Sequence, residues 1–337
     1  MRYKPFGNTK LTVSEIGLGC ARLGGLVTQN QVRGESPLTL LHKALDAGIT
    51  FFDTADMYTQ GESETLIGKA FYGKRDRVVI ASKGGYCLPA QRKFLAGIKP
   101  LVRPLARALG LKRENLPASV TGKLSQDFSA TYLTGAVEAS LRRLKTDYLD
   151  LYQVHSPPKE TILSGEFIET LEKLKLQGKI RYYGVAVDTV DDAIACLDFS
   201  EISSVMVPFG LLNLEALDSF FSPAADRKLA VVARGCFGGG LLNVDLTQKQ
   251  LQEKTFRWQE IMRYRRTAEQ HGRSLTETAL QFSLNIRPIT VNLLGMRTEA
   301  HLRTNLDYLA APALSDFELR ALAAVKEGTD VSTLSAK

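Results

Sequence analysis

Three polar residues each follow an apolar run of the sequence: Asp53 after TFF, Lys83 after VVIAS and His155 after YLDLYQV. Tyr58 lies five residues after Asp53. A free tyrosine has a pKa near about 10, so it needs a neighbouring cation to stabilise its phenolate. Lys83 can supply that cation, Asp53 can hold the ammonium in place, and His155 can donate a hydrogen bond to a carbonyl oxygen. The set predicts a site that adds or removes a proton as a hydride moves.

Each of these residues alone also has a structural interpretation, because a lone histidine is usually a hydrogen-bonding group and a lysine after a strand is usually solvated. The set is more specific than its members, and other catalytic patterns are absent. The chain contains no G-x-S-x-G elbow, no Walker A loop and no H-x-H or H-E-x-x-H pair. Its four cysteines form no C-x-x-C pair, so we expect free thiols and no metal site. They are Cys20, Cys87, Cys196 and Cys236.

The elements that must position these residues are short strands alternating with amphipathic helices. Helical patterns cover residues 38–48, 131–144 and 167–179, and a hairpin is expected over Tyr3–Val13. Eight strand–helix units predict an α/β fold, a (β/α)8 TIM barrel, in which polar residues at the carboxyl ends of strands are the first candidates for catalysis. A doubly wound sheet is the alternative, although Gly17-Leu18-Gly19 does not lead directly into a helix. The expected strands are 16–19, 50–52, 78–82, 148–154, 180–186, 203–207, 229–233 and 289–294.

The length alone suits either two domains of about 150 residues or one α/β barrel. The chain has 337 residues, 44% of them hydrophobic and 23% charged, with a mean hydropathy of −0.08. These values exclude a disordered chain, a disulfide-stapled miniprotein and a membrane protein. The start, MRYKPFGNTK, lacks the apolar region of a signal peptide, so we expect a cytoplasmic protein. We expect one barrel over residues 1–327 and a polar tail over 328–337.

The formal net charge is +7, which suits an anionic ligand but is modest for a nucleic-acid-binding protein of this size, so no nucleic acid is expected. A long insertion follows the third strand, over residues 86–126, and carries eight basic residues against one acidic residue. Three interpretations stay open: a solvated insertion, a lid that attracts acidic substrates, and a basic amphipathic patch that docks on a membrane surface or a partner. No transmembrane segment is expected.

Four strings, ITFFDTADMYTQGESETLIGKAF, VVIASKGG, SLRRLKTDYLDLYQVHSP and KLKLQGKIRYYGVA, resemble the aldo-keto reductase superfamily in order and spacing. The similarity covers nearly the whole chain. The resemblance implies a (β/α)8 barrel that binds NADP(H) in an extended form without a Rossmann fold. It also implies a catalytic tetrad at Asp53, Tyr58, Lys83 and His155, with the tyrosine as general acid in carbonyl reduction and general base in alcohol oxidation.

The resemblance also implies positions for the cofactor. VVARGCFGGGLL resembles the family's loop after the seventh strand, where backbone N–H groups cradle the pyrophosphate and Arg234 lies at the nicotinamide platform. LLGMRTEAHLRTNL resembles the segment that grips the adenosine end, where Arg297 can pair with a 2′-phosphate. The implied cofactor-binding residues are Gly19, Cys20, Asp53, Ala186, Met206, Arg234, Gly235, Cys236, Phe237, Gly238, Gly239, Leu241, Gly295, Arg297, His301 and Asn305.

Some positions depart from the family pattern. Ala186-Val187 stands where many members carry a Ser-Asn pair, and Met206 stands where many carry a glutamine, so the side-chain hydrogen bonds to the nicotinamide carboxamide are missing. His301 occupies a position where arginine or glutamine commonly helps to hold the 2′-phosphate. NADP(H) is the expected cofactor, and these departures keep NAD(H) open as an alternative.

The resemblance thus implies an NADP(H)-dependent oxidoreductase that interconverts an aldehyde or ketone and its alcohol. Its partner is a small-molecule carbonyl or alcohol, and the basic insertion favours an acidic one. Two alternatives stay open. One is an NAD-dependent sugar or pyridoxine-type dehydrogenase. The other is a non-catalytic binding protein that senses the nicotinamide state on the same barrel, which the resemblance to potassium-channel β subunits allows.

Overall fold

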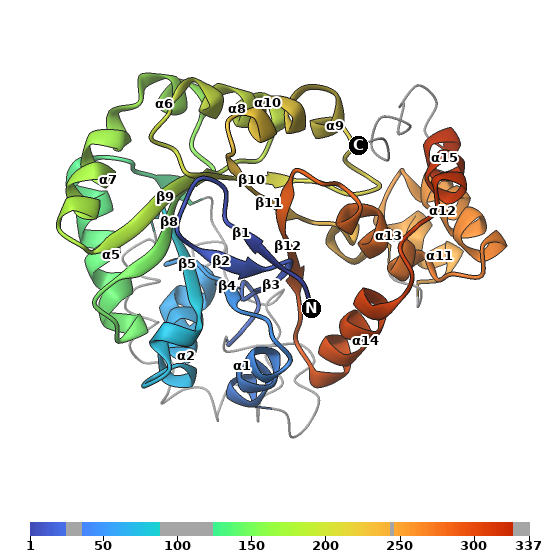
Figure 1. Cartoon of the computed structure of the whole chain (residues 1–337), viewed down its shortest axis with the longest axis horizontal. Helices are drawn as coiled ribbons and strands as arrows, with labels where there is room; N and C mark the ends of the chain where they lie inside the picture. The colour runs from blue at the N-terminus through green and yellow to red at the C-terminus, as the bar shows by residue number, and fades with distance from the viewer. Residues whose placement is uncertain (25–35, 88–123, 243–245, 326–337) are drawn as a thin grey trace.

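The computed structural model describes residues 1–24, 36–87, 124–242 and 246–325. Eight parallel strands close into a barrel in the order β10-β11-β12-β3-β4-β5-β8-β9, and helices surround them (Figure 1). Each lies within two residues of a strand that the sequence predicted, so the (β/α)8 fold is confirmed. The barrel strands are β3 (Ile16–Gly19), β4 (Phe51–Asp53), β5 (Val79–Gly84), β8 (Leu149–His155), β9 (Ile180–Ala186), β10 (Ser204–Pro208), β11 (Ala230–Arg234) and β12 (Ile289–Gly295).

The strands are apolar on both faces because each face meets a different core. Alternate residues such as Phe51, Leu151 and Val232 point into the barrel and form one cluster. The residues between them, such as Phe52 and Tyr152, pack outward against the helices in a larger cluster. This two-sided burial explains why the strands appear in the sequence as nearly continuous apolar runs.

Several helices, α5 and α14 among them, begin at side-chain caps that can be recognised in the sequence. Ser129 accepts a hydrogen bond from the backbone N–H of Tyr132 at the start of α5, and Thr298 does the same for His301 at the start of α14. The helices are α1 (Pro37–Asp46), α2 (Glu62–Ala70), α5 (Ala130–Leu144), α6 (Lys159–Ser164), α7 (Glu166–Leu176), α8 (Val190–Ala195), α9 (Ala216–Ser219), α10 (Phe221–Asp226), α11 (Gln248–Lys254), α12 (Trp258–Gln270), α13 (Leu275–Leu284), α14 (Glu299–Ala310) and α15 (Asp316–Val325).

The sequence placed the end of α7 three residues too late, at residue 179. Gly178 adopts a left-handed conformation with φ +72°, and the N–H of Lys179 turns back to the carbonyl of Leu174. The helix therefore stops at Leu176, and the glycine lies in the turn that follows it.

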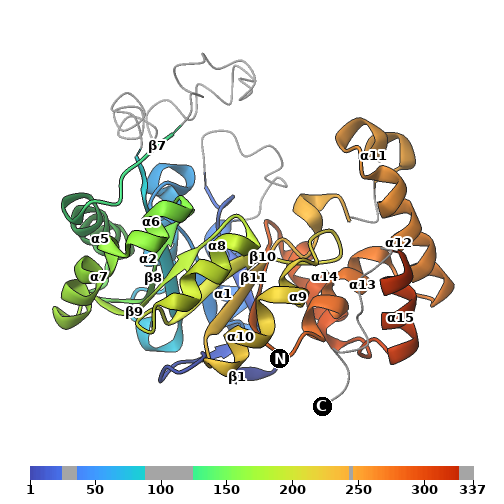
Figure 2. The same ribbon diagram turned by 90° about the horizontal axis from the view of Figure 1, so that it is seen from above.

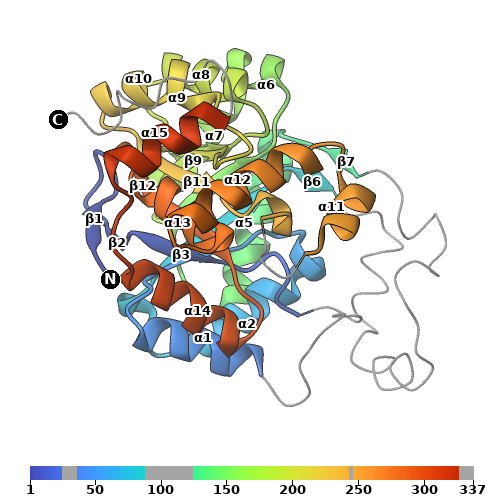
Figure 3. The same cartoon turned by 90° about the vertical axis from the view of Figure 1, so that its right-hand side faces the viewer.

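A hairpin of β1 (Tyr3–Pro5) and β2 (Thr12–Ser14) covers the amino-terminal end of the barrel, as predicted. Phe6 is buried inside that end, with its ring 5.7 Å from the ring of Phe51. A second hairpin, β6 (Tyr86–Cys87) with β7 (Ser125–Gln126), lies at the opposite end (Figures 2 and 3). The β1–β2 hairpin and Phe6 thus close the barrel interior at its amino-terminal end.

The insertion predicted over residues 86–126 is described only at its base, because residues 88–123 lie outside the described ranges. The three interpretations of its charge therefore stay predictions, as does the polar tail at 328–337, which is also outside them. Within the described ranges, every helix is too short or too polar to cross a membrane.

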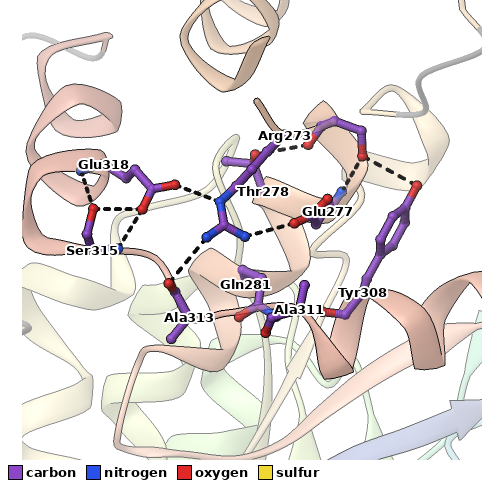
Figure 4. Close-up of polar contacts among 10 residues, drawn as sticks. Arg273, Glu277, Thr278, Gln281, Tyr308, Ala311, Ala313, Ser315 and Glu318 are labelled. Atoms are coloured by element: carbon purple, nitrogen blue, oxygen red, sulfur yellow. Dashed lines mark hydrogen bonds and ion pairs between the residues drawn. The ribbon is translucent and has the colours of Figure 1, made fainter. Parts of the chain in front are cut away.

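The carboxyl-terminal helices are joined by a cluster of polar contacts around Arg273, in the turn between α12 and α13 (Figure 4). Its guanidinium donates to Glu277 at 2.8 Å and to Glu318 of α15 at 2.6 Å. Gln281 donates from α13 to the carbonyl of Ala311, just beyond α14, at 3.1 Å. These contacts hold α13, α14 and α15 together at the side of the barrel.

Candidate active site

The predicted tetrad comes together at the carboxyl end of the barrel. The strands β4, β5 and β8 are neighbours, and they deliver Asp53, Lys83 and His155 at or next to their last residues. The Lys83 ammonium lies 2.7 Å from Asp53 Oδ2 and 3.4 Å from the Tyr58 hydroxyl, and it also donates to the carbonyl of Thr54 at 2.8 Å. Parallel neighbouring strands bring residues far apart in sequence to one point, which is the physical basis of the set.

Tyr58 owes its position to a tight left-handed turn. It begins a short 3-10 helix (Tyr58–Gly61), within which Thr59 and Gln60 have φ angles of +47° and +61°. A left-handed conformation is unfavourable for a threonine, so other contacts must hold it. The Thr59 hydroxyl lies 2.9 Å from the carbonyl of Leu23 and accepts from the N–H of Ser63 at 3.1 Å.

Burial shifts the pKa values of the tetrad. Burial raises the pKa of Asp53, and Lys83 opposes this rise. Burial lowers the pKa of Lys83, but Asp53 and Tyr58 outweigh it, so the net pKa is raised and the ammonium stays charged at pH 7. Burial, together with the charges of Lys83 and Arg234, keeps the pKa of His155 well below its ordinary value, so the imidazole is neutral. A neutral imidazole is a hydrogen-bond donor that carries no charge of its own.

Tyr58 differs from the expectation in one respect. Lys83 lowers the pKa of Tyr58, as the sequence analysis anticipated, but burial raises it more, and the net pKa lies above the ordinary value. The hydroxyl is therefore protonated at neutral pH. This state suits a group that donates a proton rather than one that removes it.

Two tyrosine rings pack against His155. The Tyr58 ring meets it edge-on at a centroid distance of 5.8 Å, and the Tyr86 ring does so at 4.9 Å. Gln126, from the other strand of the β6–β7 hairpin, donates to the carbonyls of His155 at 3.3 Å and Ser156 at 2.7 Å. The base of the insertion thus holds the strand end that carries the histidine.

The loop after β11 leaves room for a phosphate-bearing ligand. Gly235 and Gly239 have positive φ angles, and a Cβ at either position would meet no described atom within 4 Å. This open backbone fits the close approach of a pyrophosphate. The resemblance implies the backbone N–H groups of Phe237, Gly238, Gly239 and Leu241 as the donors to the pyrophosphate. Two of them already donate within the turn, Gly238 to the carbonyl of Gly235 and Leu241 to the carbonyl of Gly238.

The second predicted cofactor segment follows β12. Gly295 is exposed with open space around its α-carbon, and Arg297 lies on the same loop, close enough to Arg22 for the two charges to interact. Burial and the charge of Arg22 both lower the pKa of Arg297. The N–H of Arg297 donates to Nδ1 of His301 at 3.4 Å, and Asn305 is buried one turn further along α14. Two neighbouring guanidinium groups suit an anionic ligand.

The remaining predicted cofactor residues lie inside or at the rim of the barrel. Arg234 is held at the end of β11, where it donates to Asp188 at 2.6 Å and to the carbonyl of Val187 at 2.9 Å. The other residues are buried or nearly so, with the N–H of Cys20 bonded to the carbonyl of Asp53. They are Gly19, Cys20, Ala186, Met206, Cys236 and Phe237.

Comparison with known proteins places the chain in a family. The model of the aldo/keto reductase family matches residues 15–327. The chain belongs to the aldo/keto reductase family. It is 29% identical over 330 residues to the oxidoreductase YqkF of Bacillus subtilis, covering 96% of this chain and 95% of that protein. It is 27% identical to the pyridoxal 4-dehydrogenase of Microbacterium luteolum, over 90% of this chain and 91% of that one.

The solved structures show the same family fold. The holo form of the aldo-keto reductase AKR11C1 from Bacillus halodurans matches with a TM-score of 0.75 at 27% identity, covering 96% of each chain. The present chain therefore has the barrel of an oxidoreductase family, as the four sequence strings implied, and a similar protein has been solved in a holo form.

Three residues that support the site were not predicted from the sequence. Asp56 lies between Asp53 and Tyr58, Tyr132 lies on α5, and Gln126 lies at the base of the insertion. The Tyr132 hydroxyl is 2.8 Å from the carbonyl of Tyr86 and 3.3 Å from Asp56 Oδ2. The only available signal was an aspartate two residues before the predicted catalytic tyrosine.

Proposed function

We propose that this aldo/keto reductase uses NADP(H) to interconvert an aldehyde or ketone and its alcohol, with Asp53, Tyr58, Lys83 and His155 as its catalytic set. The observation that carries the proposal is the Lys83 ammonium, which lies within 2.7 Å of Asp53 and 3.4 Å of the Tyr58 hydroxyl. In a protein of this family, the buried arrangement of Asp53, Lys83 and Tyr58 supports proton transfer at the mouth of the barrel. A cytoplasmic location stays a prediction.

In reduction, the protonated Tyr58 delivers its hydrogen to the substrate oxygen as that oxygen gains negative charge. Lys83 stabilises the phenolate that Tyr58 becomes, because an ammonium lies beside it in a buried site. Asp53 keeps Lys83 charged and oriented. The neutral His155 donates a hydrogen bond to the carbonyl oxygen and so orients and polarises it.

The residues present fit a nicotinamide dinucleotide. The open glycines after β11 would hold the pyrophosphate, and Arg297 with Arg22 would hold an anionic group at the other end. The bound nicotinamide supplies or accepts the hydride. Ala186 and Met206 carry no side-chain partner for a carboxamide, so backbone groups and packing would orient the ring.

The test is the variant Tyr58→Phe, with Tyr72→Phe, whose side chain is exposed, as its matched control. Loss of the general acid lowers kcat for a panel of aldehydes by about 10²–10⁴-fold. Binding of NADPH, measured by fluorescence titration, stays within about twofold because the phenol does not hold the cofactor. A Tyr58→Phe variant with wild-type kcat would contradict the proposal, and a parallel loss of NADPH binding would make the role of Tyr58 structural.

An NAD-dependent sugar or pyridoxine-type dehydrogenase is the second candidate. The similarity to a protein named pyridoxal 4-dehydrogenase favours the pyridoxine-type substrate but does not bear on the choice of NAD. The ratio of kcat/KM for NADP and NAD decides between them. A preference for NADP that Arg297→Met removes supports the first candidate, whereas a preference for NAD supports the second. Tight nicotinamide binding without turnover of any carbonyl or alcohol would favour a sensing protein.

A further inference from the structure

Beside the tetrad lies a carboxyl group that the proposed proton transfer does not use. Asp56 stands two residues before Tyr58, and its backbone N–H donates to the carbonyl of Lys83 at 3.0 Å. Its Oδ1 is shielded from solvent and has no hydrogen-bond partner among the described residues. Its Oδ2 lies 3.3 Å from the hydroxyl of Tyr132. A carboxyl group with one orphan oxygen is costly to bury as an anion.

The Tyr132 hydroxyl has only one hydrogen, and it faces the carbonyl of Tyr86, the carboxyl group of Asp56 and the thiol of Cys87. The hydroxyl oxygen is 2.8 Å from the carbonyl oxygen of Tyr86 and 3.3 Å from Asp56 Oδ2. The shorter contact is to the carbonyl, which can only accept. The contact to Asp56 is then a hydrogen bond only if the carboxyl group is protonated and donates to the Tyr132 oxygen.

The surroundings favour that protonated form. Burial and the charge of Glu64 raise the pKa of Asp56 to about 7, while Arg143 opposes the rise. Arg143 is already bound to Glu64, with Nε and Oε2 2.6 Å apart. The backbone N–H of Met57 also interacts with the carboxyl group and opposes the rise in its pKa. The Tyr152 hydroxyl lies nearby and has no partner among the described residues. A Cβ on Gly84 would lie 2.1 Å from that hydroxyl and 3.3 Å from Asp56 Oδ2.

Tyr86, whose carbonyl accepts the hydrogen bond from Tyr132, contacts the candidate active site. The carbonyl that accepts from Tyr132 belongs to Tyr86, and the ring of Tyr86 packs edge-on against His155 at 4.9 Å. Tyr86 is also the first residue of the β6–β7 hairpin. The contacts therefore run from Asp56 through Tyr132 and Tyr86 to the imidazole.

We propose that Asp56, in its carboxylic acid form, is a positioning residue for His155. Its O–H donates a hydrogen bond to the Tyr132 oxygen, and the Tyr132 O–H therefore donates its own hydrogen bond to the carbonyl of Tyr86. When Asp56 ionises, its carboxylate becomes a stronger hydrogen-bond acceptor than the carbonyl of Tyr86. The Tyr132 O–H then donates to the carboxylate, and the carbonyl loses its donor. The Tyr86 ring then moves relative to the imidazole. The inference rests on the proposed function only in assigning His155 to the carbonyl.

The test is the NMR signal of the His155 Cε1–H in histidine-labelled protein, assigned among the four histidines with a His155→Gln variant. The pKa of His155 lies well below its ordinary value, so the ring itself does not titrate near pH 7. Wild-type protein is expected to show a step in this signal centred near pH 7, from the ionisation of Asp56. In Asp56→Asn the step disappears, because the amide donates to Tyr132 at every pH.

Two further variants separate position from charge. Tyr132→Phe breaks the link at every pH, so at pH 6 its His155 signal takes the position that the wild type shows only above pH 8. Asp76→Asn is the control: it removes an exposed carboxylate that takes no part in these contacts, and we expect it to keep the wild-type step. An unchanged step in Asp56→Asn, or an acid-form signal in Tyr132→Phe at pH 6, overturns the proposal.

The same variants give a second readout in turnover. We expect wild-type kcat for carbonyl reduction to fall as the pH rises through about 7, where Asp56 ionises, and we expect no such fall in Asp56→Asn. A fall that persists unchanged in Asp56→Asn overturns the role of Asp56 in the reaction. If no variant turns over any carbonyl, the proposed function has failed, whereas the NMR signals still decide whether Asp56 positions His155.

Discussion

The sharpest quantitative prediction concerns the buried pair Lys83 and Asp53. Their side chains are 1% and 2% exposed, and the atoms Nζ and Oδ2 lie 2.7 Å apart. Removing one partner of such a pair leaves an uncompensated charge in the barrel, which costs about 3–5 kcal/mol, whereas replacing both with apolar residues is close to neutral. We therefore expect Lys83→Met and Asp53→Val each to lower the free energy of unfolding by about 3 kcal/mol or more.

The double variant is expected to lose only about 0–1 kcal/mol, which gives a coupling energy of about 5–6 kcal/mol between the two sites. Urea unfolding followed by circular dichroism at pH 7 measures all four free energies. Changes in packing at either site occur in the single and the double variant alike, so they cancel in the cycle. Additive losses, within about 0.5 kcal/mol, would refute a stabilising ion pair in the barrel.

Three further predictions concern packing and charge away from the tetrad. Gly68→Ala is expected to lower the free energy of unfolding by about 1–3 kcal/mol, because the new Cβ would lie 2.5 Å from the backbone oxygen of Leu144. Gly135→Ala, in open space within α5, should instead raise it by about 0.5–1 kcal/mol, and denaturant unfolding of the two variants compares them directly. Arg273→Met leaves two carboxylates without their cation and should lower the thermal midpoint, and a wild-type midpoint would show that the cluster contributes little.

The sequence predicted the barrel because its strands are buried on both faces and are short, apolar and regularly spaced. It predicted the tetrad because Asp53, Lys83 and His155 each interrupt an apolar run at its carboxyl end, where the fold directs side chains into one mouth. These are local signals, and parallel strand order turns them into one site.

The supporting contacts could not be predicted in this way. Tyr132 reaches Tyr86 across 46 residues, and Gln126 reaches His155 across 29, so neither pairing leaves a local pattern. The strands β6 and β7 have two residues each, too few for a periodic signal. The raised pKa of Tyr58 depends on burial by the assembled mouth, which no spacing of residues reports.

The hairpin base has a consequence for engineering. Gln126 donates to two backbone carbonyls at the end of β8, and Tyr132 donates to the carbonyl of Tyr86. These contacts hold both ends of the insertion, and none of them involves a residue between Cys87 and Ser125. The chain between Cys87 and Ser125 can therefore be exchanged for another segment while both anchors are kept. A library of grafted segments on this stem would test whether the insertion contributes to the choice of substrate, while the contacts that position the candidate active site are kept.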